Sequence, residues 1–146
     1  MSAEIVIDVG CMNHGVDSTS VLIDRFAPGF YYGFDPLCDD AGYKMGQTLV
    51  SITGKAAWLY DGYISFRTDG DASRIDDSQA SPAVPCFDFG EWLEETLCRG
   101  DVILKLDCEG AEFGLIDAMM QRRQLDQLKL LLVEWHLPCK VEEWTL

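Results

Sequence analysis

Four charged side chains lie close together in the stretch KLDCEGAE, at residues 105–112. The apolar run VIL precedes them, so Lys105 and Asp107 belong to the end of a buried strand and share one face of it. Glu109 joins that face if the chain stays extended, and Glu112 follows in the first helical turn. A buried lysine needs a partner, so we expect an ion pair between Lys105 and a carboxylate. Either this pair only fixes the strand and the next helix, or the acids line the reactive end of a cofactor.

The sequence contains two histidines. His136 ends the stretch LLLVEWH, and His14 lies in a glycine loop near the start of the chain. The pKa of an imidazole is near neutral, so either residue could accept a proton from an attacking hydroxyl. A histidine in a loop is also compatible with no catalytic role.

The stretch IDVGCMNHG, at residues 7–15, is typical of a strand that runs into a glycine loop and a helix. Gly10 and Gly15 have the spacing of a phosphate loop, but Val16 and Asp17 replace its Lys-Ser/Thr. Met12 replaces the second glycine of the dinucleotide fingerprint. The loop therefore suits a cofactor without phosphates, although a plain turn between a strand and a helix has the same pattern.

Asp35 ends the next predicted strand, twenty residues after Gly15. An acid at about this distance binds the ribose hydroxyls in nucleoside sites. A carboxylate there would accept both hydroxyl protons. Since Pro36 follows, Asp35 is equally compatible with the start of a turn.

The elements that must position these residues alternate between strands and helices. We expect strands at residues 4–9, 30–35, 48–53, 101–107 and 128–135, and helices at 18–27, 36–46, 110–121 and after Asp88, where Glu91 completes a capping-box spacing. Residues 56–60 and 63–67 flank Asp61-Gly62 and predict an inserted β-hairpin, and residues 68–82 predict a mobile loop. This alternation favours an α/β fold with a mostly parallel sheet in the order 3-2-1-4-5, whose ligands bind beyond the carboxyl ends of the strands.

Length and composition favour one globular domain over residues 1–146, with 48% apolar and 25% charged residues. The formal charge of −14 argues against binding to nucleic acid or to anionic lipid. Six scattered cysteines without a CxxC pair indicate reduced thiols in a cytoplasmic protein, with no disulfide framework and no zinc site. No signal peptide and no membrane-spanning run is expected, because the first apolar run is short and contains Asp8.

Several motifs together resemble the FkbM-type methyltransferases. DVG before a glycine loop and FDP after the second strand are followed in order by FDFGEWLEE, VILKLDCEGAEFGLI and LLLVEWH. The KxDxEGxE signature of that family matches Lys105, Asp107, Glu109, Gly110 and Glu112. The resemblance implies a Rossmann-like methyltransferase sandwich that binds S-adenosyl-L-methionine. It also implies transfer of the methyl group to a hydroxyl of a sugar or another small metabolite.

The resemblance implies roles for individual residues by position. Asp8, Gly10 and Gly15 would hold the methionine half, Asp35 the ribose, and residues near Lys55 the adenine. The implied cofactor-binding residues are Asp8, Gly10, Cys11, Asn13, Gly15, Asp35, Pro36, Lys55 and Ala56, and the catalytic residues are Asp107, Glu109 and His136. Methyl transfer requires no metal, and the residues show no clean cluster of metal ligands.

The chain ends ten residues after His136, where members of that family continue into a further helix and an antiparallel strand pair. We therefore expect a truncated C-terminus and an exposed fifth strand, which would favour a homodimer through that edge. One alternative is a non-catalytic module of the same fold that binds S-adenosylmethionine or serves in assembly. A nicotinamide-dependent reductase is a third hypothesis, which the missing GxGxxG disfavours.

Overall fold

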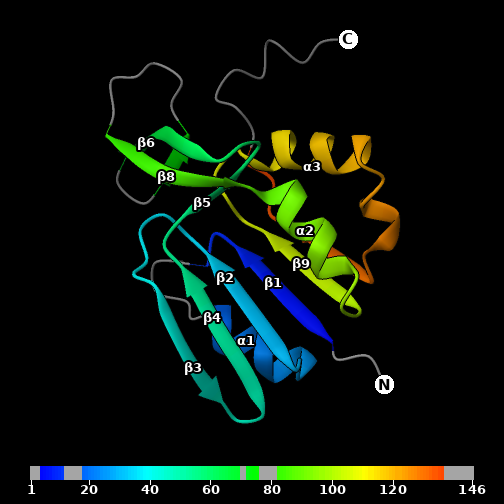
Figure 1. Cartoon of the computed structure of the whole chain (residues 1–146). Coiled ribbons are helices and arrows are strands. Elements are labelled where there is room, and N and C mark those ends of the chain that lie inside the picture. Colours follow the sequence, from blue (N-terminus) through cyan, green and yellow to red (C-terminus); the bar gives the residue numbers. More distant parts are fainter. Residues whose placement is uncertain (1–3, 12–17, 70–71, 76–81, 137–146) are drawn as a thin grey trace.

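A computed structural model of the chain describes residues 4–11, 18–69, 72–75 and 82–136. Within these residues the fold is α/β, with two sheets and three α-helices (Figure 1). The larger sheet has six strands, which are, from edge to edge, β10 (Leu130–Val133), β9 (Val102–Leu106), β1 (Ile5–Val9), β2 (Phe30–Phe34), β4 (Thr48–Thr53) and β3 (Ala41–Met45). All of its neighbouring pairs are parallel except β3 with β4.

The order expected from the sequence is not that of the whole sheet, because the sheet is mixed and carries a sixth strand. With β3 left aside, the parallel neighbours are β4-β2-β1-β9-β10, which are the five expected strands. The difference lies in residues 36–46, where the predicted helix is wrong. A turn at Gly46 and Gln47 reverses the chain, so that Ala41 pairs with Ile52 and Met45 with Thr48. The antiparallel strand β3 therefore occupies the sheet edge.

Helices lie on both faces of the large sheet (Figure 1). Side chains of β1 alternate between the two faces, since successive residues of a strand point in opposite directions. On one face Val6 packs with Leu22 and Ile23 of α1 (Ser18–Phe26). On the other face the core joins β1 and β9 to α2 (Phe89–Leu97) and α3 (Glu112–Gln121), through Ile5, Ile7, Val9, Leu104, Leu106, Phe89, Leu93, Leu115 and Met119.

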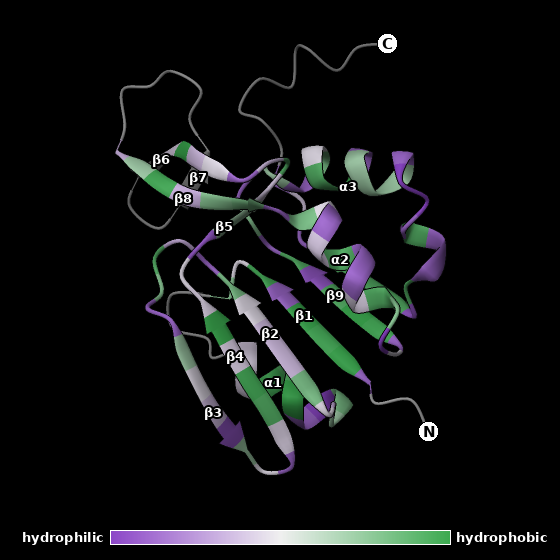
Figure 2. Ribbon diagram, viewed as in Figure 1, coloured by the Kyte–Doolittle hydropathy of each residue, from purple (hydrophilic) through white to green (hydrophobic). Residues whose placement is uncertain are grey.

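Burial on both faces explains the composition of the central strands. Figure 2 shows β1 as hydrophobic along most of its length, whereas the edge strand β3 is largely pale or hydrophilic. All five residues of β1 are buried, including Asp8. A continuous apolar run is what a central parallel strand requires, and Asp8 is its exception.

The smaller sheet has the order β5 (Ala56–Trp58), β8 (Ala83–Asp88), β6 (Gly62–Asp69) and β7 (Ala72–Ile75), and it lies beyond the carboxyl ends of the parallel strands (Figure 1). The predicted hairpin across Asp61-Gly62 is wrong, because β8 lies between β5 and β6 and pairs with both. The predicted loop at residues 68–82 contains β7 and the end of β6, and residues 70–71 and 76–81 lie outside the described part.

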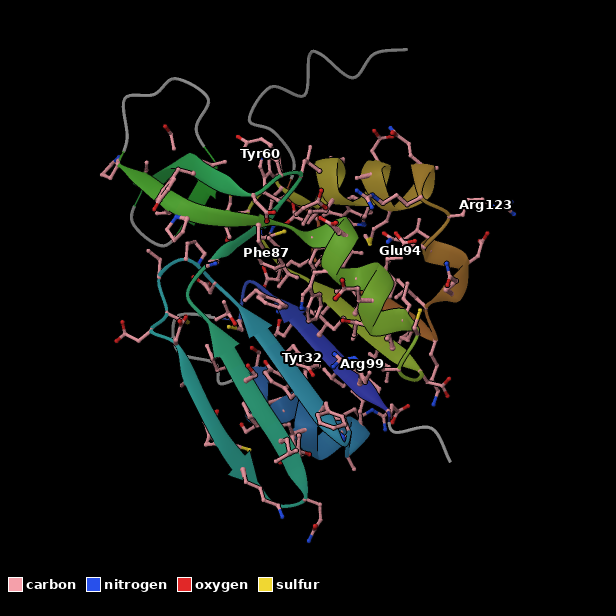
Figure 3. All side chains as sticks on the ribbon, viewed as in Figure 1. Tyr32, Tyr60, Phe87, Glu94, Arg99 and Arg123 are labelled. Atoms are coloured by element: carbon pink, nitrogen blue, oxygen red, sulfur yellow. The ribbon has the colours of Figure 1, made fainter. Side chains whose placement is uncertain are left out.

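The end of β8 leads directly into α2, and its cap agrees with the sequence. The Asp88 side chain accepts a hydrogen bond from the Glu91 N–H at 2.9 Å, as a helix N-cap does. The N–H of Asp88 donates to the Asp61 side chain at 3.0 Å, so Asp61 supports the start of the helix. At the other end of α2, the Arg99 guanidinium donates to the Tyr32 hydroxyl at 3.0 Å, and Figure 3 shows these two side chains near each other.

Other expectations concern cysteines and membranes. The five cysteines among the described residues are free thiols, as expected, and Cys139 lies outside that part. In the described chain, no helix has the length and apolar character needed to cross a bilayer. The short strand β10 lies at an edge of the large sheet, but whether it pairs with a second copy stays a prediction.

Candidate functional site

Asp8, at the end of β1, is held entirely by protein groups. Its side chain is completely buried, and its Oδ2 accepts hydrogen bonds from Ser18 Oγ and Tyr31 Oη, each at 2.7 Å. Its Oδ1 accepts from Lys105 Nζ at 3.0 Å. The expected ion pair of Lys105 is therefore confirmed, and Asp8 has protein partners on both of its oxygens.

Lys105 joins the ends of two neighbouring strands. Its ammonium lies 3.0 Å from Asp8 Oδ1 and 3.3 Å from Asp107 Oδ2, so it bridges β1 and β9. Burial on its own lowers the pKa of Lys105, but the charges and hydrogen bonds of Asp8 and Asp107 outweigh burial and raise it. Lys105 thus stays charged and ties one oxygen of Asp107 to the core.

Gly10 makes the turn after β1 and lies against the backbone after β9. Its φ is +82°, and a Cβ at this position would lie 1.7 Å from the Asp107 carbonyl oxygen. A side chain therefore cannot fit without moving Asp107. Gly10 therefore allows close contact between the loops after β1 and β9. This contact fixes the position of the backbone that carries the acids after β9.

Asp107, Glu109 and His136 come together beyond the end of β9. His136 Nε2 lies 3.4 Å from Glu109 Oε1 and 3.7 Å from Asp107 Oδ1. Glu134 Oε1 lies at 3.8 Å from the same nitrogen. The side chains of Glu109 and His136 are 31% and 24% exposed, so the group is open to solvent while Asp107 is nearly buried. The three residues expected to be catalytic are thus neighbours.

Glu112 holds the loop after β9 and the His136 ring in place through hydrogen bonds. Its side chain is fully buried, and its two oxygens accept the backbone N–H groups of Cys108 and Gly110, each at 2.7 Å. Glu112 Oε1 also lies 2.9 Å from His136 Nδ1. Because a carboxylate only accepts, His136 Nδ1 donates this bond, and Nε2 faces the acids.

The backbone between Asp107 and Glu112 is strained at Glu109. This residue has a φ of +51°, which a side chain other than glycine adopts at a cost. Such strain persists only where the surroundings over-determine the conformation, as the two bonds to Glu112 do here. The conformation directs Glu109 toward His136.

The electrostatics of the group follow from burial and from like charges. Burial raises the pKa of Glu109, His136 lowers it, and Asp107, Glu112 and Glu134 raise it, with a net increase. Burial lowers the pKa of His136, but the hydrogen bond to Glu112 and the nearby carboxylates produce a net increase. Both groups therefore hold protons more tightly than in water.

Asp35 follows β2 and is almost fully buried. Its Oδ1 accepts from the Leu37 N–H at 2.9 Å, so the turn that the sequence offered as one alternative is present after Pro36. Cys11 lies near this turn. Burial raises the pKa of its thiol, and the nearby Cys38, Asp8 and Asp35 raise it further. The ribose role of Asp35 stays a prediction.

A pocket of about 380 Å³ lies beyond the ends of β2 and β4, which is a size that suits small ligands. Its walls include the aromatic side chains Phe34, Phe87 and Trp92, together with Thr53, Lys55 and Glu91. Lys55 is thus the predicted cofactor residue that lines this pocket. Ala56 is buried in β5, where it pairs with Cys86. Asn13 and Gly15, like His14, lie outside the described residues.

No family model, curated protein or solved structure matches this chain. The FkbM-type resemblance therefore stays a prediction. A function for the chain has to be inferred from the geometry of its described residues.

The sequence reasoning missed the partners that hold the predicted residues. Tyr31 and Ser18 bind Asp8, and Thr19 shares a 3.1 Å hydrogen bond with the Tyr31 hydroxyl. Strand alternation contained a signal for Tyr31, because Val6 pairs with Tyr31 and Asp8 is on the same face as Val6. The bond from His136 to Glu112 had no local signal, since 24 residues separate them.

Proposed function

We propose that this protein is an S-adenosylmethionine-dependent methyltransferase that methylates a hydroxyl group of a sugar or another small metabolite. The observation that carries the proposal is the group of Asp107, Glu109 and His136 beyond the end of β9. Ligands of open parallel sheets bind at these strand ends. Hydroxyl methylation needs a proton acceptor, and this group provides carboxylate and imidazole acceptors at that place.

The charge of the site fits this cofactor. S-adenosylmethionine carries a sulfonium, an ammonium and one carboxylate, so its net charge is positive, and it has no phosphate. The strand ends present Asp35, Asp107 and Glu109, and the whole chain has a formal charge of −14. A cofactor rich in phosphates would meet repulsion here, whereas a cation is attracted.

Several residues would hold the parts of the cofactor. In this proposal the turn at Gly10 and Cys11 holds the methionine half, and Asp35 accepts from the ribose hydroxyls while its Oδ1 keeps the turn to Leu37. The aromatic pocket beside Lys55 takes the adenine, because flat rings pack well against aromatic side chains.

When bound, S-adenosylmethionine supplies a methyl group whose C–S bond breaks, with its electron pair going to sulfur, as the acceptor oxygen forms the new C–O bond. Glu109 takes the proton of that hydroxyl, since its raised pKa makes it a better base than an ordinary carboxylate. His136 is held by Glu112 and orients the hydroxyl, and Lys105 keeps Asp107 in place.

Calorimetric titration with S-adenosylmethionine, S-adenosylhomocysteine and NADH tests the proposal. We expect both S-adenosyl compounds to bind and NADH not to bind. Asp35→Ala should weaken S-adenosylmethionine binding by more than about tenfold, since it removes a charged acceptor. Asp35→Asn is the companion variant, because it retains an acceptor for the Leu37 N–H but lacks the charge.

Asp39→Ala is the matched control, because it removes an exposed acid of the same loop. It should bind the cofactor with nearly wild-type affinity. Absence of S-adenosylmethionine binding, or binding of NADH in its place, would contradict the proposal. Binding without methyl transfer to any hydroxylated compound would favour the non-catalytic module instead.

A further inference from the structure

We infer that Asp107, Glu109 and His136 bind a divalent transition-metal ion such as Mn²⁺. Each residue offers one ligand atom, and these three atoms lie within 4.8 Å of one another. The set consists of one imidazole nitrogen and two carboxylate oxygens, and it is open to solvent on the side of Glu109. This inference replaces the expectation of no metal.

The distances in the group suit ligands of an ion better than hydrogen-bonded partners. His136 Nε2 lies 3.4 Å from Glu109 and 3.7 Å from Asp107, and both distances exceed those of ordinary N–H···O bonds. Two ligands that each stand about 2.0–2.2 Å from one ion at tetrahedral or octahedral angles lie roughly 3–3.6 Å apart. The 3.4 Å separation lies within this range and the 3.7 Å separation lies just above it, so a small movement of Asp107 brings both into the range.

The surroundings of His136 provide a second and independent observation. A histidine that binds a metal usually donates its other ring N–H to a carboxylate or carbonyl, which fixes the ring. Glu112 does this from a fully buried position, at 2.9 Å from His136 Nδ1. As a result Nε2, and not Nδ1, faces Asp107 and Glu109.

The charges around the group also favour a cation. Lys105 is bound to Asp8 and to Oδ2 of Asp107, so it lies on the core side of that carboxylate. Asp107 Oδ1 and Glu109 Oε1 both lie within 3.7 Å of His136 Nε2. A divalent ion between them offsets their repulsion, whereas a protonated His136 is the metal-free way to do so.

The mixed donor set indicates the kind of ion. Carboxylates suit Mg²⁺ and Mn²⁺, imidazole suits Fe²⁺, Zn²⁺ and their neighbours, and thiolates are absent from the set. Mn²⁺ accepts both donor types. Three protein ligands leave open positions, and if the proposed function holds, the acceptor hydroxyl would bind there and lose its proton more readily. Glu109 would then bind the ion through one oxygen and take that proton on its other oxygen, because each residue of the set offers one ligand atom.

Titration of chelator-treated protein with Mn²⁺, followed by electron paramagnetic resonance and without any cofactor, tests the inference. We expect one saturable ion per chain. Glu109→Gln and His136→Asn should each weaken binding by about tenfold or more. Glu134→Gln is the matched control, because it removes the same charge from the same corner and should change affinity by less than about threefold.

No saturable binding up to about 1 mM Mn²⁺ would overturn the inference. An equal loss of affinity in Glu134→Gln and Glu109→Gln would also overturn it, because the ion would then respond to charge alone. Far-ultraviolet circular dichroism checks that each variant is folded. Since no S-adenosylmethionine is present, failure here leaves the proposed methyltransferase function standing, and the reverse also holds.

Nuclear magnetic resonance identifies the ligand itself. The chain has two histidines, so His14→Asn leaves His136 as the sole imidazole. Mn²⁺ at a small fraction of the protein concentration should broaden the ring ¹⁵N signals of His136 in this variant. Binding of Mn²⁺ that leaves these signals sharp would place the ion elsewhere and overturn the inference.

Discussion

The ends of β1 and β9 both carry acids at one edge of one sheet, yet the two strand ends differ in how those acids are satisfied. Asp8, in β1, is completely buried and accepts from Ser18, Tyr31 and Lys105 at 3.0 Å or less. Glu109, after β9, is partly exposed, stands on a left-handed backbone, and lies 3.4 Å from His136. Asp8 is thus fully hydrogen-bonded within the fold, whereas Glu109 belongs to a group of side chains that is open to solvent.

The acids at the carboxyl ends of these strands therefore have different roles: Asp8 stabilises the fold, and Glu109 is available for binding. Both oxygens of Asp8 are used by protein donors, so its removal should damage the fold. Glu109 is held in its conformation at an energetic cost, which the surrounding structure must offset. We therefore expect substitutions at β1 to change stability and substitutions after β9 to change binding.

Asp8→Asn should have the largest effect. It leaves Lys105 without its closest buried partner, and breaking a buried pair from one side destabilises by about 3–5 kcal/mol. The free energy of unfolding in urea measures the loss. Tyr31→Phe, which removes one hydrogen bond to the same carboxylate, should cost about 1–2 kcal/mol. Equal losses in the two variants would show that the ion pair contributes little.

The two glycines of these strand ends offer a matched pair. Gly10→Ala combines a positive φ of +82° with a Cβ 1.7 Å from the Asp107 carbonyl oxygen, so we expect a loss of about 2–4 kcal/mol. Gly110→Ala has a φ of +101° but no heavy atom within 4 Å of the new Cβ, so the loss should be about 1–2 kcal/mol. Urea unfolding of both compares them, and a greater loss at Gly110 would mean that contact between the loops is unimportant.

The parallel strands could be predicted because they depend on local alternation. A carboxylate partner for Lys105 could be predicted because a buried lysine needs one, but the sequence did not identify Asp8, which is 97 residues away and is the closest partner. The short helix at residues 36–46 and the hairpin at Asp61-Gly62 failed for a different reason. In each case the local pattern was weak, and a strand elsewhere decided the pairing: β4 for β3, and β8 for β5 and β6.

The candidate site was predictable as a set of residues but not as an arrangement. Strand-end reasoning gathered Asp107, Glu109 and His136 at one edge. It could not give the bond from His136 to Glu112, or the left-handed φ of Glu109, because these depend on how the chain returns after α3 and β10. The sequence therefore indicated proton acceptors, and the geometry adds a metal site.

Glu109→Gly should have the smallest effect on stability, and it separates strain from binding at a single residue. Glycine adopts the φ of +51° without strain, so the free energy of unfolding should stay the same or rise by up to about 1 kcal/mol.

Urea unfolding with and without Mn²⁺ tests both the backbone strain at Glu109 and its role as a metal ligand. For the wild type Mn²⁺ should raise the midpoint, because an ion that binds the folded state stabilises it. For Glu109→Gly the metal-free midpoint should be at least that of the wild type, and Mn²⁺ should raise it by clearly less than in the wild type. A variant that is less stable without Mn²⁺ and is stabilised by it as much as the wild type would contradict both roles of Glu109.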